Sequence, residues 1–566
     1  MHEKIEKALG LEEGVVELTF PQFFEHGDFM TNVSLTLAKK ENKNPKELAE
    51  QFKEALEKAK LPGIEKIEVA GPGFINFFLK KEFLAESIGT IDEKFGTSDL
   101  LSGKKIMVEY TDPNPFKEFH IGHLMTNTIG ESIARLFAAN GGEVKKVCYQ
   151  GDKGLHVAKA VWAIKKKEEA EFKTLSDFGA AYAEGNRAYE ENDEAKKEII
   201  EINKEIYTGV NDEINALYEK GRTLSFQLFE EVYKKLGTKF DYYFFESETA
   251  DIGKQKVEEG LAKGIFEVGE RGAIVYPESR SGIHTRVFIN SEGIPTYEAK
   301  ELGLAFAKQE NVPVRENAWS PASSYITYYF DKTISITGNE INDYFRVVLS
   351  ALHEINPDLA SKIKHISHGM LRLPSGKMSS RTGDVVTAES LIEEAKAKIL
   401  EKMGDRDIPN KEVAAEIIAI GAIKFSILRQ APGKDIIFDF DKSLSFEGDS
   451  GPYLQYTVVR ARSVLEKAKE AGVKLETKGG EREVGEVERM LIRFPKIVER
   501  AQEEYSPQYV VTYLLELASL FNSYYAENRI VDAGDSAPYR VALTKAVATV
   551  IENGLDLLGI GVPSKM

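Results

Sequence analysis

Two histidines, His120 and His123, stand one helical turn apart in the stretch PNPFKEFHIGHLMT, where an apolar helical pattern begins. At the N-terminus of a helix, the free backbone N–H groups and the helix dipole favour anions. Two imidazoles there can donate hydrogen bonds to phosphate oxygens, and Gly122 between them lets a flat nucleotide approach the backbone. The stretch therefore predicts a nucleotide cradle, in which positioned donors stabilise charge that develops on phosphate groups.

A metal site is the second interpretation of the histidine pair. Imidazoles one turn apart can ligate an ion together, with Glu118 as a third ligand, but the spacing differs from the HExxH pattern. The single cysteine, Cys148, permits neither a thiolate zinc site nor an internal disulfide. We therefore favour the nucleotide cradle and expect no protein-bound zinc.

A second stretch, SKIKHISHGMLRLPSGKMSSR at residues 361–381, holds five basic residues and no acidic one, against a net charge of −17 for the chain. One interpretation is a solvated basic face; the glycine and serines around Lys377 favour an anion-binding loop instead. It is no P-loop, because Leu371 and Met378 occupy positions that need glycine and serine or threonine. Lys377 on such a loop would bring a cation to a triphosphate from the side opposite the histidines.

Alternating strand and helix patterns surround both stretches. They occupy residues 104–110, 124–140, 143–150, 333–337, 342–355 and 364–370. This alternation is typical of a parallel sheet with crossover helices, which binds ligands at the carboxyl ends of its strands. Because both stretches follow strands in the same sense, we expect them to face one pocket.

The chain of 566 residues is longer than one hydrophobic core usually supports. We expect a small α+β domain at residues 1–98, a Rossmann-like α/β catalytic domain at 99–392 with a helical insertion at about 165–235, and an all-helical domain at 393–566. Strand patterns disappear beyond about Asp407. No apolar run reaches the length of a membrane span, and the N-terminal residues lack the apolar core of a secretion signal. We expect a cytoplasmic protein and a monomer.

HIGH at residues 120–123 and KMSSR at 377–381 resemble the two signatures of class I aminoacyl-tRNA synthetases. The surrounding EYTDPNPFKEFHIGHL, YQGDKGLH, PTYEAKELGLA and SGPYLQYTVVRARSVL narrow the resemblance to arginyl-tRNA synthetases. The resemblance implies that arginine and ATP, which carries Mg²⁺, form arginyl-adenylate, and that the arginyl group passes to the terminal adenosine of tRNA(Arg). The alternatives are a class I synthetase of another amino-acid specificity and a non-catalytic tRNA-binding relative.

The resemblance also assigns roles to residues. It assigns catalysis to His120, His123, Lys117 and Lys377. It assigns ATP binding to His120, Gly122, His123, Gly151, Asp152, Lys377, Met378, Ser379 and Arg381. A guanidinium requires acids and flat hydrogen-bond acceptors, and arginine would be bound by Glu109, Asn114, Tyr297 and Glu301. RNA contacts, by stacking or pairing with splayed bases, would come from Asn76, Tyr453, Gln455, Tyr456, Arg460 and Arg462.

Some positions depart from the family's pattern. Ser380 stands where the second signature usually has lysine, and Lys117 is expected to supply part of the missing charge. Glu301 replaces the usual aspartate, and Glu340 and Ile341 occupy the place of a glutamine. A buried carboxylate left unpaired by a wrong amino acid can give about 10⁴ to 10⁵ of selectivity, so we expect no editing domain.

Overall fold

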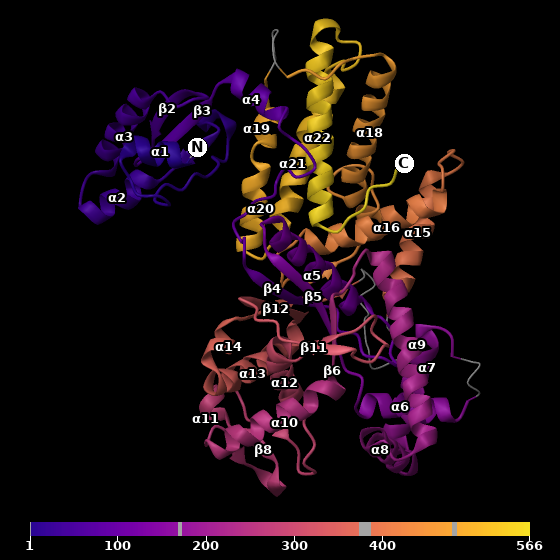
Figure 1. Ribbon diagram of the computed structural model, residues 1–566. Helices are drawn as coiled ribbons and strands as arrows, with labels where there is room; N and C mark the ends of the chain where they lie inside the picture. Colours follow the sequence, from indigo (N-terminus) through magenta and orange to yellow (C-terminus); the bar gives the residue numbers. More distant parts are fainter. Residues whose placement is uncertain (1, 168–171, 373–385, 478–483) are drawn as a thin grey trace. The chain divides into compact units, whose positions relative to one another are not determined.

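The computed structural model describes residues 2–167, 172–372, 386–477 and 484–566 (Figure 1). Contacts between residues divide the chain into two compact units. The larger unit contains Ser98–Gln455, Glu499–Val511 and Leu555–Met566, and the smaller contains Met1–Thr97, Tyr456–Val498 and Thr512–Gly554. The predicted domain boundaries after residues 98 and 392 stay predictions.

A five-stranded parallel sheet forms the centre of the larger unit, in the order β13–β12–β4–β5–β6. Its strands are β4 (Lys105–Glu109), β5 (Glu143–Gln150), β6 (Tyr242–Phe245), β12 (Lys332–Gly338) and β13 (Ile363–His368). The chain runs from β4 outward to β6 and then returns to the other side of β4. The order thus reverses between β4 and β12, at the place where open α/β sheets bind ligands.

The predicted α/β class is confirmed. Four of these strands lie in segments that their sequence patterns predicted, whereas β6 was missed, because its run YYFF shows no alternation that could distinguish it. The helices between the strands are α5 (Ile121–Ala139), α6 (Leu155–Lys165), α10 (Glu246–Ala262), α12 (Tyr297–Glu310), α13 (Asn342–Ile355) and α14 (Pro357–Ser361). Figure 1 shows α5 beside β4, β5 and β12.

The charge-dense stretch that was predicted as a helical insertion forms α7 (Leu175–Glu191), α8 (Asp193–Thr208) and α9 (Asp212–Leu236). These helices pack with α6 around a core that includes Val161, Phe178, Ile199 and Ile214. Smaller pieces complete the sheet region: β7 (Glu267–Val268), β8 (Ile274–Tyr276), α11 (Glu278–Ser281), β9 (Arg286–Ile289), β10 (Val312–Val314) and β11 (Ser324–Ile326). Strands β7, β8 and β9 pair in antiparallel fashion.

In the smaller unit, the N-terminal residues form the expected α+β module. Its antiparallel sheet has the order β1–β3–β2, with β1 at Phe29–Thr31, β2 at Ile64–Ala70 and β3 at Phe74–Leu79. Its helices are α1 (His2–Leu9), α2 (Val33–Glu41), α3 (Pro45–Ala59) and α4 (Lys81–Ile88). Ile75 and Phe77 of β3 are fully buried against Ala49 and Leu56 of α3, so one face of the sheet carries the core.

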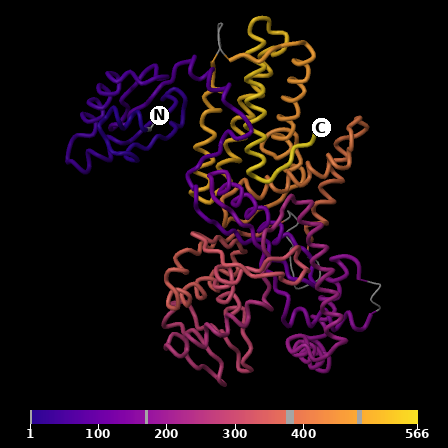
Figure 2. Tube along the Cα trace, viewed as in Figure 1, coloured from indigo at the N-terminus to yellow at the C-terminus, as the bar shows by residue number. Residues whose placement is uncertain are grey.

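Long helices dominate the C-terminal part, as predicted. They are α15 (Ala388–Met403), α16 (Lys411–Leu428), α17 (Phe440–Ser443), α18 (Gly451–Glu470), α19 (Glu486–Leu491), α20 (Phe494–Glu503), α21 (Gln508–Glu527) and α22 (Ala537–Leu557). Figure 2 traces α18, α21 and α22 running alongside one another, and Gly554 packs against Leu514. Of the helices that the structure describes, none is long and apolar enough to cross a membrane.

The prediction that strands disappear beyond Asp407 is wrong. A short strand, β15 (Ile436–Ile437), pairs in parallel with β14 (Leu371–Arg372), just before the second signature in sequence. A strand of two residues has no period to detect, and its partner is distant in sequence. Only tertiary structure reveals this pairing.

Candidate active site

His120 caps the N-terminus of α5 with its own side chain. Its Nδ1 accepts hydrogen bonds from the backbone N–H of Gly122 at 3.1 Å and of His123 at 3.4 Å, and His123 Nδ1 accepts from the N–H of His120 at 3.3 Å. The two rings stack with centroids 3.6 Å apart. Because each Nδ1 accepts a hydrogen bond, a neutral ring carries its proton on Nε2. Both Nε2–H groups are then donors for an anion.

The surroundings keep both rings neutral. Burial, then the nearby charge of Lys117, lowers the pKa of His120 to about 4. Burial, then His120 and Lys117, lowers the pKa of His123 well below its ordinary value. A Cβ atom on Gly122 would lie 2.9 Å from two atoms of the His120 ring. The cap itself therefore requires glycine at this position, whether or not a nucleotide lies there.

Lys117 is a cation held close to this histidine pair. Its Nζ lies 4.6 Å from the centroid of the Tyr182 ring. Burial, then the charge of Lys159, lowers the pKa of Lys117 to about 8. Because burial disfavours its charge, an anion that binds beside it would restore the ordinary pKa. The predicted role of Lys117 at a triphosphate stays a prediction.

The loop between β4 and α5 has an unusual backbone. Residues with positive φ are Thr111 (83°), Asp112 (46°) and Phe116 (64°). Such angles are costly for a β-branched residue such as Thr111, and this strain is typical of functional loops. Asn127 of α5 donates to Thr111 Oγ1 at 3.0 Å, and Asp112 Oδ1 accepts from the N–H of Tyr149 at 2.7 Å. These bonds fix the loop that carries Asn114 and Lys117.

Carboxyl groups gather near the reversal point of the sheet. Glu109, at the end of β4, is buried and pairs with Lys308 of α12, with Nζ 2.6 Å from Oε2. Glu246, directly after β6, is paired with Lys300 of α12 at 2.7 Å. Burial, then the charge of Glu109, raises the pKa of Glu301 to about 8. A positive ligand is therefore favoured here, because it would stabilise the ionised form of Glu301.

Two carboxyl groups of this cluster, Asp112 and Glu246, were not predicted. Burial, then the charge of Glu109, raises the pKa of Asp112 well above its ordinary value. Gly151 packs so closely that a Cβ there would overlap Asn114 Oδ1 and lie 3.0 Å from Glu246 Oε1. Asn114 and Glu246 therefore share one neighbourhood. The signal for Glu246 was its position directly after the aromatic run that forms β6.

Tyr297 and Glu301 lie one turn apart on α12, as their spacing predicts. The Tyr297 side chain is 56% exposed, and its backbone carbonyl accepts a hydrogen bond from Tyr344 Oη at 2.9 Å. The Lys300 ammonium lies 5.3 Å from the Tyr297 ring centroid. Glu340, which stands near the place of the family's glutamine, lies over Gly338 at the end of β12, where a Cβ would overlap its carboxylate.

Asp152 has a structural role. Its buried carboxylate accepts hydrogen bonds from Ser247 N at 2.9 Å, Ser247 Oγ at 2.7 Å, Arg222 Nε at 3.1 Å and Tyr218 Oη at 3.4 Å. These bonds join α9 and α10 to the loop after β5. The carboxylate is fully occupied by these partners, and its predicted contact with ATP stays a prediction.

The second signature lies outside the described residues, including the candidates Lys377, Met378, Ser379 and Arg381 and the substituted Ser380. The segment that follows it is described. The N–H of Ile121 donates to the Val386 carbonyl at 3.3 Å, and the N–H of Ala388 donates to the Phe119 carbonyl at 2.9 Å. His120 and Thr387 form an antiparallel bridge. The chain after the second signature thus lies directly beside the first.

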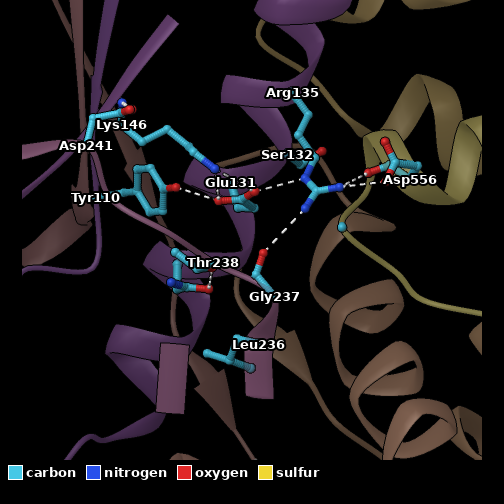
Figure 3. Close-up of polar contacts among 12 residues, drawn as sticks. Tyr110, Glu131, Ser132, Arg135, Lys146, Leu236, Gly237, Thr238, Asp241 and Asp556 are labelled. Atoms are coloured by element: carbon cyan, nitrogen blue, oxygen red, sulfur yellow. Dashed lines mark hydrogen bonds and ion pairs between the residues drawn. The ribbon is translucent and has the colours of Figure 1, made fainter. Parts of the chain in front are cut away.

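The buried carboxylate of Glu131 anchors the middle of α5, C-terminal to the histidine pair. Figure 3 shows Tyr110, Arg135 and Lys146 pointing toward Glu131, which accepts from them at 2.5, 2.8 and 3.2 Å. Burial would raise the pKa of Glu131, but Lys146, Arg135 and the Tyr110 hydrogen bond hold it below its ordinary value. Arg135 also donates to Asp556 Oδ1 at 2.7 Å. The network ties α5 to β5 and to the last turn of α22.

Not all the RNA-binding candidates are accessible. Gln455 is 0% exposed, and its Nε2 donates to the Gly561 carbonyl at 2.6 Å and the Ile417 carbonyl at 3.3 Å. Asn76 is 4% exposed within β3. This structure presents neither side chain to RNA, because both are buried and Gln455 is also held by its internal hydrogen bonds. Their contacts with tRNA stay predictions.

The other RNA-binding candidates lie on α18 and are partly exposed. The Arg460 guanidinium lies 4.7 Å from the centroid of the Tyr456 ring and donates to Asn522 Oδ1 at 2.9 Å. Arg462 donates to Glu552 Oε1 at 2.9 Å. Tyr453, half-buried, begins the same helix. These side chains combine aromatic faces with positive charge, which suits stacking on unpaired bases.

For the alternative metal interpretation, the described residues supply no third ligand beside the histidine pair. Among the residues that the structure describes, no group of three or more His, Cys, Asp or Glu side chains could hold a metal ion. Glu118 lies against Gly179 of α7, where a Cβ would overlap its side chain.

Comparisons with known proteins extend over the whole chain. Family models match at residues 1–79 (Arginyl tRNA synthetase N terminal domain), 90–440 (tRNA synthetases class I (R), catalytic domain) and 454–566 (DALR anticodon binding domain). The arginine–tRNA ligase of Clostridium kluyveri is 31% identical over 583 residues, covering 100% of this chain and 99% of the relative. That of Treponema denticola is 32% identical over 513 residues, covering 86% and 84%.

A solved structure agrees with these matches. The arginyl-tRNA synthetase of Thermus thermophilus superposes with a TM-score of 0.81 at 26% sequence identity, covering 100% of this chain and 99% of that one. The match includes the N-terminal module, the parallel sheet and the C-terminal helices. With the capped histidine pair and the acidic cluster at one end of its sheet, the chain belongs to the class I arginyl-tRNA synthetase family.

Proposed function

We propose that the protein activates arginine with ATP, forming arginyl-adenylate and pyrophosphate, and transfers the arginyl group to the 3′-terminal adenosine of tRNA(Arg). One observation carries the proposal: a pair of neutral, stacked imidazoles caps α5, and an acidic cluster lies at the carboxyl ends of β4 and β6 of the same sheet. Membership of the arginyl-tRNA synthetase family supports it.

The N-terminus of α5 would bind the ATP phosphates. The Nε2–H groups of His120 and His123 point away from the cap bonds that occupy their Nδ1 atoms. A neutral donor of this kind stabilises the charge that develops on phosphate in the transition state, and one such donor contributes about 2.7–4 kcal/mol. Lys117 and the second-signature residues Lys377, Met378, Ser379 and Arg381 would add further contacts. Mg²⁺ would arrive with ATP and neutralise part of its charge.

The acidic cluster would bind arginine. Lys308 and Lys300 already pair with Glu109 and Glu246. Glu301, with its pKa near 8, is mostly protonated at neutral pH. A guanidinium that binds there would stabilise the ionised carboxylate and gain a charge-assisted hydrogen bond. Asn114 and Tyr297 would supply the neutral contacts.

The acidic cluster also bears on the alternative of a class I synthetase with another amino-acid specificity. An enzyme specific for glutamate or glutamine would need a cation for the side chain of its substrate, whereas the pocket presents Glu109, Glu246 and Glu301. A non-catalytic relative is disfavoured by the intact first signature. Both alternatives lead to measurable differences in the exchange reaction.

The remaining parts would bind tRNA. We propose that residues 1–98 and 393–566 contact tRNA(Arg), with Tyr453, Tyr456, Arg460 and Arg462 on the face that meets unpaired bases. Net charge of −17 implies that such contacts are local. We also propose that the protein works as a monomer in the cytoplasm.

ATP–pyrophosphate exchange, measured with each standard amino acid and with or without bulk tRNA, tests the proposal. We expect exchange with arginine, and charging of tRNA(Arg) in a separate aminoacylation assay. Exchange driven by another amino acid would overturn the specificity. No exchange with any amino acid, even with tRNA present, would overturn the catalytic function.

A further inference from the structure

A hydroxyl and an imidazole join the first turn of α5 to the end of β13. Thr126 Oγ1 lies 2.9 Å from the Gly122 carbonyl oxygen and 2.7 Å from His368 Nε2. His368 Nδ1 lies 2.7 Å from the Gly369 carbonyl oxygen. Thr126 is 7% exposed and His368 is 4% exposed, so water does not compete freely for these bonds. We call Thr126 and His368 the latch.

When His368 is neutral, the latch has fewer protons to donate than it has hydrogen-bond contacts. The hydroxyl supplies one proton and a neutral imidazole supplies one, but the three contacts need three. The latch therefore has two neutral arrangements: either Thr126 donates to Gly122 and His368 to Thr126, or Thr126 donates to His368 and His368 to Gly369. Burial lowers the pKa of His368, which supports the neutral ring. Both arrangements keep the Thr126–His368 bond.

The β13 side of the latch is firmly held. A Cβ on Gly369 would overlap the Lys434 backbone, so this strand end packs directly against another segment. The N–H of Met370 donates to Asp435 Oδ1 at 2.9 Å, and the N–H of Ile436 donates to the Met370 carbonyl at 2.8 Å. The strand end is thus a fixed support, on which the latch can position the N-terminus of α5.

We propose that Thr126 and His368 are positioning residues for adenylate formation, because in both arrangements their bond holds the start of α5 on the end of β13. The start of α5 carries the imidazoles of His120 and His123, while none of the hydrogen bonds in the described part of the chain joins the proposed arginine-binding side chains to the latch. Loss of the latch should therefore displace the phosphate donors more than the arginine-binding side chains, because the Asn127–Thr111 and Tyr149–Asp112 bonds hold the loop of Asn114 separately. This inference rests on the proposed function.

Thr126→Val tests the latch, since valine keeps the shape of threonine and removes the hydroxyl. Thr128→Val is the matched control: Thr128 lies on the same helix, is fully buried, and its hydroxyl has no hydrogen-bond partner in the described part of the chain. Thr126→Ser restores the hydroxyl. His368→Leu and the double variant Thr126→Val/His368→Leu complete a double-mutant cycle.

In arginine-dependent exchange, we expect kcat/KM for ATP to fall roughly tenfold in Thr126→Val, as for loss of one buried hydrogen bond. We expect KM for arginine to match that of Thr128→Val, and the melting temperature to fall slightly below that of this control because His368 loses a buried partner. Thr126→Ser should recover most of the activity. The double variant should lose no more than the worse single variant, because both changes remove one bond.

Other outcomes would overturn the proposed positioning role of Thr126 and His368. Equal kcat/KM for ATP in Thr126→Val and Thr128→Val would show that the hydroxyl positions nothing. A fall in melting temperature and in active fraction, with kcat/KM for ATP per active enzyme unchanged, would show a purely structural role. Additive losses in the double variant would show that the two residues act independently. Absence of arginine-dependent exchange in the unchanged protein would refute the proposed function, which is a separate result.

Discussion

At the scale of single residues, the active site depends on charges that burial has altered. His120 and His123 are donors without charge, Lys117 is a cation whose charge is disfavoured, and Glu301 is an acid that keeps its proton near neutral pH. Each would interact most strongly with a ligand that restores its charge or accepts its hydrogen bond. Two predictions belong to this scale.

The first prediction concerns pH and arginine. Because the pKa of Glu301 is raised to about 8 and the guanidinium favours the ionised carboxylate, KM for arginine should fall as pH rises toward 8. The change approaches tenfold for each pH unit below the pKa. Steady-state exchange kinetics between acidic and mildly basic pH measure this, and Glu301→Gln should remove the dependence. A KM that stays flat in the unchanged protein would contradict it.

The second prediction concerns Lys117. Lys117→Ala should lower the rate of exchange by about 10² to 10³, if the ammonium acts as a donor to the phosphates. The control is Lys166→Ala, since Lys166 also lies over an aromatic ring, at 3.5 Å from the Trp162 centroid, but has no proposed role at the site. Near-normal turnover of Lys117→Ala at low millimolar ATP would show that this charge is dispensable.

At the scale of elements, α5 is the helix that the site depends on. Its N-terminus holds the histidine pair, and its middle holds Glu131, whose carboxylate binds Tyr110, Arg135 and Lys146 (Figure 3). The bonds to Glu131 hold the middle of α5 in place, and this helps to keep its N-terminus in position. The anchor should therefore affect stability of the larger unit more than the chemistry.

The third prediction tests this anchor. Arg135→Met removes the guanidinium from Glu131 and Asp556 but keeps most of the aliphatic stem, and should cost about 1–3 kcal/mol of stability. The control is Arg346→Met, because the Arg346–Asp343 pair is exposed and should contribute little. Thermal unfolding would measure both variants. Equal melting temperatures would contradict the anchoring role.

At the scale of the whole molecule, an acidic protein must bind a polyanion. The candidates for this contact combine aromatic rings with arginines on α18, as Tyr456 and Arg460 do. Stacking depends little on net charge, so a few local contacts can act against an overall repulsion. Tyr456 and Arg460 belong to the smaller unit, whereas the proposed sites for ATP and arginine belong to the larger unit. We therefore expect substitution of these two residues to change the binding of tRNA and not that of the small substrates.

The fourth prediction follows from this. Tyr456→Leu should raise KM for tRNA in aminoacylation by about tenfold or more, as expected for one lost base-stacking contact. KM values for arginine and ATP should not change. Tyr325→Leu is the control, since Tyr325 is an exposed tyrosine that lies on β11 in the larger unit. If Tyr456→Leu charges tRNA normally, the ring belongs to the helix packing instead.

The sequence alone determined the class of fold, the family and the location of both signatures, because strand and helix periods and the HIGH and KMSSR spacings are local patterns. Through resemblance it also assigned arginine binding to Glu109, Asn114, Tyr297 and Glu301, and these assignments stay predictions. It could not locate Glu246 and Asp112 in the acidic cluster, because their approach to Glu301 depends on how the strand ends and α12 come together in the fold.

Tertiary structure decided which groups are available. It gave the side chains of Asp152 and Gln455 internal hydrogen-bond partners. Burial lowered the pKa of His120 and made its ring neutral. Folding also brought Thr126 and His368, which are far apart in the sequence, within hydrogen-bond distance. Burial and hydrogen-bond partners come from residues far apart in the chain, so no local pattern encodes them. The same residue types thus acquire different chemistry from the neighbours that folding supplies.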